Sequence, residues 1–446
     1  MLERWSFIAH RIRERLWIKP LAVCLLSILA VFLARMADGS GLGELVPHIT
    51  RDSNETVLKI MAASMLVMAT FAVASMVSAY ASAASSATPR SFALVVADDV
   101  SQNALSAFVG AFIFSVVALV ALMNGFYGRA GQFVLFALTM LAFAVVVVTF
   151  VRWVDIIARL GRLGNTVDRV EAAACASFRQ RQRRPLLGGR PALPAPAASR
   201  AVATEAIGYL QHVDAKALQR TAERAGLRIF VESLPGAFCT PQRPVARVVA
   251  DDGAAVCDAD ADAVIAAFEV GQSRAFDQDP RFGVIALSEI ASRALSPAVN
   301  DPGTAVVVIG SLVRLFLAWD SSGREARAGE CAPEFDRVLV PSLSLEDLFD
   351  DAFTAIARDG AATVEVAVRL QKALATLALV DDTRMRANAV RHAALAARRA
   401  DAALRFPPDR EALEASAGWW RNPARSSPGQ DRTAPGARFP GTSGPA

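Results

Sequence analysis

Apolar residues gather in four long runs within the first third of the chain. The runs cover 20–37, 60–82, 104–123 and 133–151. A helix needs about 20 mostly apolar residues to cross a bilayer. The pattern therefore predicts four transmembrane helices, and the short polar segment 124–132 joins the last two as a helical hairpin.

The first run follows several basic residues, as the apolar core of a signal peptide also does. However, no clear small-residue cleavage site follows it, and three more apolar runs come after it. We therefore expect this segment to be retained as a membrane helix.

Lys and Arg are distributed unequally around the four runs. The flank before the first run and the flank after the fourth are basic, through Arg4, Arg11, Arg13, Arg15, Lys19, Arg152, Arg159, Arg162 and Arg169. The connection 38–56 instead holds Arg51 among four acidic residues. Because basic flanks stay on the cytoplasmic side, both termini are expected in the cytoplasm.

The second run is rich in small side chains, namely Ala63, Ala69, Ala72, Ser75, Ala79, Ser82 and Ala83. Small residues let helix backbones approach closely in lipid, so this helix is expected to pack within the chain, at a subunit interface or around a pore. No run carries a charged residue near its centre. This disfavours an intramembrane proton relay but leaves a hydrophobically gated pore open.

Beyond residue 151 the pattern changes to shorter, mixed elements. Residues 152–184 continue the fourth helix as an amphipathic connection with arginines between its apolar positions. A Pro-, Ala- and Gly-rich break over 185–199 follows. Strands are then expected at 206–214, 227–233 and 243–250, with a helix at 215–226.

Helical patterns dominate the rest of the chain. Helices are expected at 282–295, at 303–319 and in two Ala-rich amphipathic stretches, 345–380 and 383–404. The last segment is rich in Pro, Gly, Ser and Arg, which is typical of disorder.

The predicted fold is thus a membrane protein with an α-helical N-terminal domain of four transmembrane helices, followed by a mixed α+β soluble cytoplasmic domain that ends in helices. The expected divisions are a transmembrane domain over 1–151, a connecting helix over 152–184, a small α+β module over 185–270, a helical domain over 271–405 and a disordered tail over 406–446.

Composition narrows the classes of function. The chain is 53% hydrophobic and its net charge of +4 is small and scattered, so nucleic acid is not an expected partner. None of the five cysteines forms a CxxC pair, and no histidine lies at ligand spacing from them, so no metal, cofactor or disulfide framework is expected. Signatures of the type GxSxG, P-loop, GxGxxG and HExxH are missing from the sequence.

The stretch SRALSPAVNDPGTA, residues 292–305, carries most of the candidate chemistry. Proline at 297 ends one helix, and Asp301 with Pro302 suits the start of the next. The candidate polar set is Arg274, Gln278, Asp279, Arg281, Arg293, Ser296, Asn300, Asp301 and Thr304.

These side chains have two interpretations. Arg with Asp and Asn can close a buried ion-pair network at a helix junction, in which Arg293 pairs with Asp279 or Asp301. They can also bind an anion at the N-terminus of the second helix. We favour the structural network, and we assign no catalytic residue and no metal ligand.

The stretch SRAFDQDPRFGVIALSEIASRALSPAVNDPGTAVVVIGSL resembles the signature of the domain of unknown function 2254 family, a family of predicted bacterial membrane proteins. The segments TPR at 88–90, GYLQHVD and FTAIARDGA are also similar, so the resemblance covers most of 10–400. Ala275, Glu289 and Gly303 stand where Thr, Asp and a bulkier residue are usual. The resemblance implies a multi-pass protein of the bacterial inner membrane and no established activity.

Three functions remain open on the sequence. The first is an oligomeric channel-like or transport-accessory protein, in contact with membrane lipid, with a cytoplasmic sensing or gating domain and copies of itself as partners. The second is a membrane-anchored enzyme that uses the polar set between Arg274 and Thr304. The third is a membrane scaffold for cytoplasmic partners.

Overall fold

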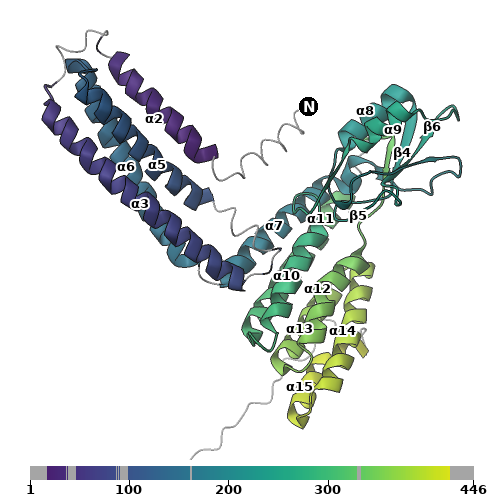
Figure 1. The fold of residues 1–446 in the computed structure, drawn as a ribbon. Helices are drawn as coiled ribbons and strands as arrows, with labels where there is room; N and C mark the ends of the chain where they lie inside the picture. Colours follow the sequence, from purple (N-terminus) through teal and green to yellow (C-terminus); the bar gives the residue numbers. More distant parts are fainter. Residues whose placement is uncertain are drawn as a thin grey trace, which may run out of the picture. The chain divides into compact units, whose positions relative to one another are not determined.

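The structure is a computed structural model that describes residues 18–36, 38, 47–86, 88, 90, 99–160, 163–328 and 333–421. The chain divides into two compact units, unit 1 over Met1–Arg169 and unit 2 over Val170–Ala446. Figure 1 shows both units, with unit 1 in purple and blue. Each unit is described by itself.

Unit 1 is a bundle of long apolar helices. They are α2 (Ile18–Met36), α3 (Arg51–Ser86), α5 (Asp99–Met123) and α6 (Arg129–Leu160). Phe108 and Trp153 lie at the centre of the packing of α3, α5 and α6, with ring centroids 6.3 Å apart. The four apolar helices expected in this region are therefore present; α3, α5 and α6 are long enough to span a membrane, and the apolar part of α2, Leu21–Met36, is shorter.

The end of α2 and the start of α6 are joined by one carboxylate. Asp38 accepts hydrogen bonds from the backbone N–H groups of Gly128 and Gly131, both at 2.7 Å. At the start of α3, Arg51 donates to the carbonyl of Met123 at 2.8 Å. These contacts place the connections after α2 and after α5 at one end of the bundle, as an up-and-down arrangement of four helices requires.

Length and composition single out four helical segments that could cross a membrane: Arg51–Ser78, Gln102–Met123, Arg129–Asp155 and Pro302–Trp319. Leu21–Met36 is a shorter apolar helix. The segment Pro302–Trp319 belongs to unit 2, where Val308, Leu312 and Phe316 are buried in a helical bundle. Its hydropathy is explained by that packing.

Unit 2 begins within α7 (Leu163–Arg183), and two small sheets follow. The first has the strand order β1 (Arg190–Pro191), β8 (Val338–Val340), β4 (Leu227–Val231), β6 (Ala246–Ala250) and β2 (Arg200–Val202). The second has the order β5 (Phe238–Cys239), β3 (Gly208–Val213) and β7 (Phe268–Gly271).

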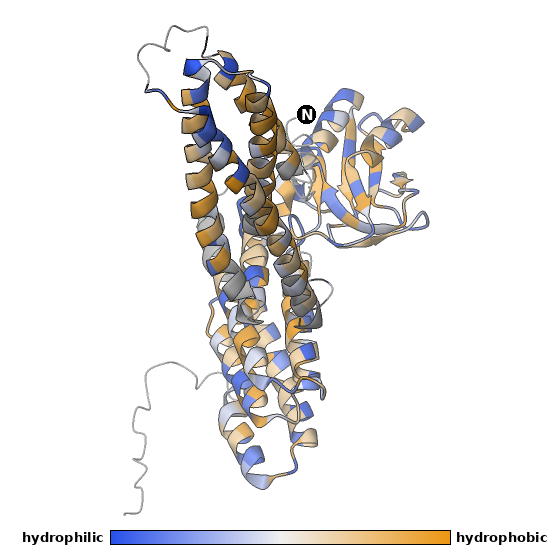
Figure 2. Cartoon of the chain, turned by 60° about the vertical axis from the view of Figure 1, so that its left-hand side comes forward, coloured by the Kyte–Doolittle hydropathy of each residue, from blue (hydrophilic) through white to orange (hydrophobic). Residues whose placement is uncertain are grey.

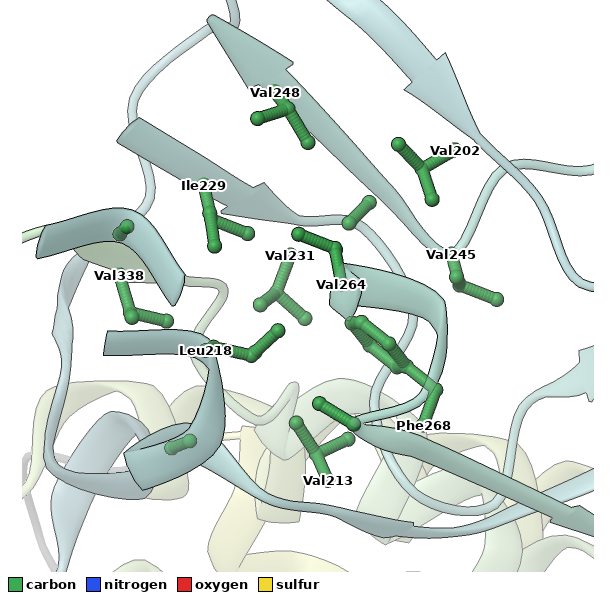
Figure 3. Packing of buried hydrophobic residues seen from close by; sticks show 14 of the residues in the cluster. Val202, Val213, Leu218, Ile229, Val231, Val245, Val248, Val264, Phe268 and Val338 are labelled. Carbon is green, nitrogen blue, oxygen red and sulfur yellow. The ribbon is translucent and has the colours of Figure 1, made fainter. Parts of the chain in front are cut away.

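Two helices, α8 (Ala215–Ala225) and α9 (Asp258–Ile265), pack with these strands. Leu218 of α8, Ile229 of β4, Val248 of β6 and Val264 of α9 belong to one buried cluster (Figure 3). Asp214 caps the start of α8 by accepting from Ala217 N, and Gly226 ends it with φ +61°. The strands and the helix expected over 206–250 are all present.

Strand β8 was not foreseen from the sequence. It lies within the stretch 271–405 that was expected to be purely helical, yet it pairs in parallel with β1 and β4 of the first sheet. The expected boundary at residue 270 therefore does not separate two independent parts. Three residues of the form VLV are too few to show a strand period.

The remaining helices form a bundle. They are α10 (Pro280–Ala294), α11 (Pro302–Ala328), α12 (Leu345–Asp359), α13 (Val364–Ala378), α14 (Thr383–Ala403) and α15 (Pro407–Ala417), and single 3₁₀ turns lie at Pro185–Gly188 and Gly418–Arg421. The rings of Phe316, Phe349 and Phe353 meet at its centre, with centroids 4.6 to 5.7 Å apart.

Helix α15 occupies part of the segment 406–446 that was expected to be disordered. Leu413 is buried in a cluster with Ala367, Ala400 and Leu404, so a short helix is stabilised by packing that composition does not reveal. Residues 422–446 lie outside the described residues.

Candidate functional site

The nine candidate polar residues fall into two groups at the two ends of α10. Arg274, Gln278, Asp279 and Arg281 stand at its N-terminal end, while Arg293 lies in its last turn and the other four follow its C-terminal end. A helix rises 1.5 Å per residue, so the 15 residues of α10 separate the groups by about 22 Å. One helix thus divides the set into two separate constellations.

The N-terminal group is built on a buried ion pair. Arg274 Nε donates to Asp279 Oδ2 at 2.7 Å, and Arg274 Nη2 donates to Asp279 Oδ1 at 2.9 Å. The two side chains are 15% and 2% exposed. Asp279 is also the N-cap of α10 and accepts from Phe282 N at 3.3 Å, while Pro280 occupies the first helical position.

The ion pair is closely covered. Gly236 has φ +96°, and a β-carbon at this position would overlap both Asp279 Oδ2 and Arg274 Nη2. The guanidinium of Arg274 lies over the ring of Phe282, 5.5 Å from its centroid. Burial raises the pKa of the Asp279 carboxyl, and the two hydrogen bonds from Arg274 oppose that effect.

Strand β3 positions the loop that carries this pair. Gln278 Oε1 accepts from Val213 N at 3.0 Å. Gln211 Nε2 donates to the carbonyl of Ser273 at 2.6 Å. Because both ends of the loop 273–279 are bonded to one strand, the side chain of Arg274 is held beside Asp279.

Arg281 does not take part in this pair but binds two carboxylates of α12. Its Nε donates to Asp351 Oδ2 at 2.7 Å and its Nη1 donates to Asp347 Oδ2 at 2.6 Å, both on α12. This half-exposed contact connects the start of α10 to the helical bundle, and it satisfies the charge of Arg281 within unit 2.

The C-terminal group forms a tight corner between α10 and α11. Ser296 Oγ donates to the carbonyl of Arg293 at 2.7 Å, and Asn300 takes the left-handed conformation with φ +49°. Asp301 caps α11, accepting from Thr304 N at 3.0 Å and from Thr304 Oγ1 at 2.6 Å. The hydroxyl and N–H of Thr304 hold the pKa of Asp301 below its ordinary value.

Asp279 and Asp301 each have a partner other than Arg293, with which one of them was expected from the sequence to pair. Asp279 binds Arg274, and Asp301 binds Thr304 of its own helix. Sequence proximity suggested the pairing, but Arg293 lies nearly four turns of helix beyond Asp279, and its side chain is half-buried.

Sequence reasoning missed Arg181. From the sequence it was left among the arginines of the amphipathic connection 152–184, yet only 7% of it is exposed, and burial lowers its pKa to about 10. The signal was present in the helix period, because Ala174, Phe178 and Arg181 recur at i, i+4 and i+7 and all three are buried. The neighbouring Arg179 and Arg183 are exposed.

A second buried ionisable group lies in the helical bundle. His392 of α14 is 3% exposed and packs against the rings of Phe349 and Phe353. Its Nε2 lies 3.1 Å from Asp350 Oδ1. Burial lowers the pKa of His392 to about 4, so the ring is neutral at pH 7.

Comparison with known proteins gives one broad match and several short ones. The family model described as "Predicted membrane protein (DUF2254)" matches residues 13–376. Uncharacterized proteins of Mycobacterium bovis and Mycobacterium tuberculosis are 44% identical over 66 residues, which is 14% of this chain and 13% of each relative. The match thus spans a small part of those relatives. No solved structure matches.

Proposed function

Because the chain belongs to the DUF2254 family of predicted membrane proteins, we propose that it is an oligomeric, channel-like or transport-accessory protein of the bacterial inner membrane. In this proposal unit 1 spans the membrane, and unit 2 lies in the cytoplasm as the sensing or gating part. Both termini are then cytoplasmic.

The outer surface of unit 1 carries the proposal. Large apolar side chains cover the outward faces of its helices, including Leu26 at 64%, Val67 at 67% and Val151 at 63% exposed. Figure 2 shows this hydrophobic colouring along the helices. Soluble monomers rarely expose apolar patches beyond several hundred Å², so a lipid environment explains this surface.

The polar side chains of unit 1 agree with a lipid environment. Ser106, Ser115 and Thr139 each donate to the carbonyl four residues earlier in the same helix, at 2.6 to 2.7 Å. Because the hydrocarbon region of a bilayer contains no water, polar groups there must find hydrogen-bond partners within the protein, as these hydroxyls do.

The outward face of α3 supports an oligomer. Ala69 and Ala72 pack inward against α5, but Thr70, Ala74 and Ser78 are exposed and recur every fourth residue. This small-xxx-small spacing lets a second helix approach closely in lipid. Close packing of two helices requires small residues on the contact face. A helix face that touches only lipid could carry large residues such as leucine instead.

The enzyme alternative gains no support from the geometry. It needs the polar set between Arg274 and Thr304 in one place, and α10 holds its two groups about 22 Å apart. In the corner group, Asp301 is already bonded to its own helix.

The test starts from the oligomeric state of the full chain in mild detergent, measured by light scattering after size-exclusion chromatography. Wild type is expected as a homo-oligomer. Ala74→Phe should shift it toward monomer, and the control Val148→Phe, at a 59% exposed position of α6, should not. A monomeric wild type refutes the oligomer.

Reconstitution into liposomes then tests the channel-like part. Ion flux above that of empty liposomes is expected from the wild type and should fall with Ala74→Phe. An intact oligomer that conducts no ion supports the scaffold alternative instead.

A further inference from the structure

Arg181 is a buried guanidinium without a bonded partner in the part of the chain that the structure describes. Its Nη2 is fully enclosed and makes no hydrogen bond, and no carboxylate of a described residue lies at ion-pair distance. A buried charge is costly unless it is paired, so such a group points to a missing counter-charge.

A second unsatisfied donor lies beside it. Ser177 is 3% exposed, and its enclosed Oγ has no hydrogen-bond partner among the described residues. Because residues i and i+4 share a helix face, Ser177 and Arg181 present their polar atoms on the same side of α7. Most buried polar groups in native proteins are hydrogen-bonded, so two neighbouring exceptions are informative.

This face of α7 meets the N-terminal end of α10. Gly283 packs so closely on Ala174 that a β-carbon at 283 would overlap it. Further along α7, the charge of Asp279 acts on Arg181 from beyond hydrogen-bond distance. The charge of Arg181 therefore lies close enough to the start of α10, where the helix dipole is positive, to interact with the carboxylate that caps it.

The other charged side chains at this place are bonded to partners of opposite charge. Asp279 is engaged by the bidentate contact with Arg274, and Arg281 is neutralised by Asp347 and Asp351 on α12. Arg181 is protonated at neutral pH because its pKa is about 10, and no carboxylate of a described residue is bonded to it.

We propose that Ser177 and Arg181, together with the Arg274–Asp279 pair at the start of α10, form a binding site for a small oxyanion of carboxylate or phosphate chemistry. A guanidinium fork matches the oxygens of such a group, and a helix N-terminus favours its charge. The low exposure of both α7 residues restricts the occupant to a small molecule or ion. The inference is independent of the channel-like proposal.

The experiment uses the full chain in detergent. Thermal melts are compared in sodium phosphate, sodium acetate and sodium chloride at equal ionic strength, and phosphate binding is measured by titration calorimetry. Phosphate or acetate should raise the melting temperature of the wild type above its value in chloride. In Arg181→Met this gain should vanish, and the dissociation constant of the stabilising anion should rise about tenfold or more, as expected for the loss of a charge-assisted hydrogen bond.

Two further variants make the test decisive. Arg179→Met removes an exposed guanidinium from the same helix and should keep the wild-type response. Arg181→Lys keeps the charge but loses the fork, so it should fold and bind the anion more weakly. In chloride, Arg181→Met should melt at or above the wild-type temperature, because it removes an uncompensated buried charge.

Three results overturn the proposal. They are an equal gain in wild type and Arg181→Met, no gain in wild type over chloride, and an Arg181→Met protein that melts well below wild type in chloride. A gain seen only in nanodiscs of anionic lipid, and not with phosphate or acetate, also overturns it, because it assigns the charge to a lipid headgroup.

Discussion

The exchange Arg274→Met tests the buried pair at the start of α10. It leaves the Asp279 carboxylate, 2% exposed and already capping a helix, without its bidentate partner. Removing one member of a buried pair costs about 3–5 kcal/mol. For a unit of this size each kcal/mol lowers the melting temperature by roughly 2–4 °C, so the expected fall is roughly 6–20 °C.

The control is Arg247→Met, which breaks an ion pair with Glu232 at 2.7 Å in which the side chains are 36% and 37% exposed. Surface pairs contribute about 0–1 kcal/mol, so this variant should melt within a few degrees of wild type. Melting is followed by intrinsic fluorescence in detergent at one fixed heating rate.

A double variant separates charge from packing. In Arg274→Met with Asp279→Asn, the asparagine keeps the capping oxygen while the unpaired charge is gone, so part of the lost stability should return. If Arg274→Met melts within the range of Arg247→Met, or if the double variant is as unstable as the sum of both single variants, the buried-pair reasoning is refuted.

Three more predictions follow from other parts of the chain. In cysteine-accessibility labelling of cells, Arg51→Cys should react from the periplasm and Arg162→Cys only from the cytoplasm; the reverse pattern inverts the topology. Asp301→Ala should lower stability by about 1 kcal/mol through loss of the cap, and Pro302→Ala by less, so equal melting temperatures in detergent contradict the capping role. The pKa of His392 is about 4 in the folded state against 6.5 ordinarily, so the unfolded state binds the proton first. The contribution of neutral His392 to the free energy of unfolding should therefore be fully present above pH 6.5 and be lost as the pH falls toward 4, by up to about 3 kcal/mol. Thermal melts of His392→Gln across that pH range should lack this loss.

Local signals predicted the elements of unit 2 well where the sequence marks both ends of an element. Asp214 and Gly226 bracket α8 because a cap and a left-handed residue are encoded at single positions. The same holds for the corner between α10 and α11, whose Asp301 and Pro302 were correctly assigned to the start of a helix.

The candidate site was harder to predict because its contacts are not local. Arg281 finds its partners 66 and 70 residues later on α12, and nothing in its neighbourhood in the sequence marks that helix as its neighbour. Arg274 and Arg293 are both arginines near Asp279 in the chain, but only the fold decides that the loop residue reaches it. The burial of Arg181 was readable from the period of α7, yet the surrounding arginines suggested a solvated face.

The strand order of the first sheet has a consequence for biosynthesis. Strand β8 lies between β1 and β4, but it is made more than a hundred residues after β4, once α10 and α11 have been synthesised. A nascent chain that has emerged only as far as β7 therefore holds an unfilled gap in this sheet, with the edge of β4 exposed. Such edges recruit foreign strands, so the emerging chain depends on the ribosome or a chaperone until residue 340 is free to insert. Proteins shortened before this residue should accumulate as aggregates rather than as a soluble α+β fragment.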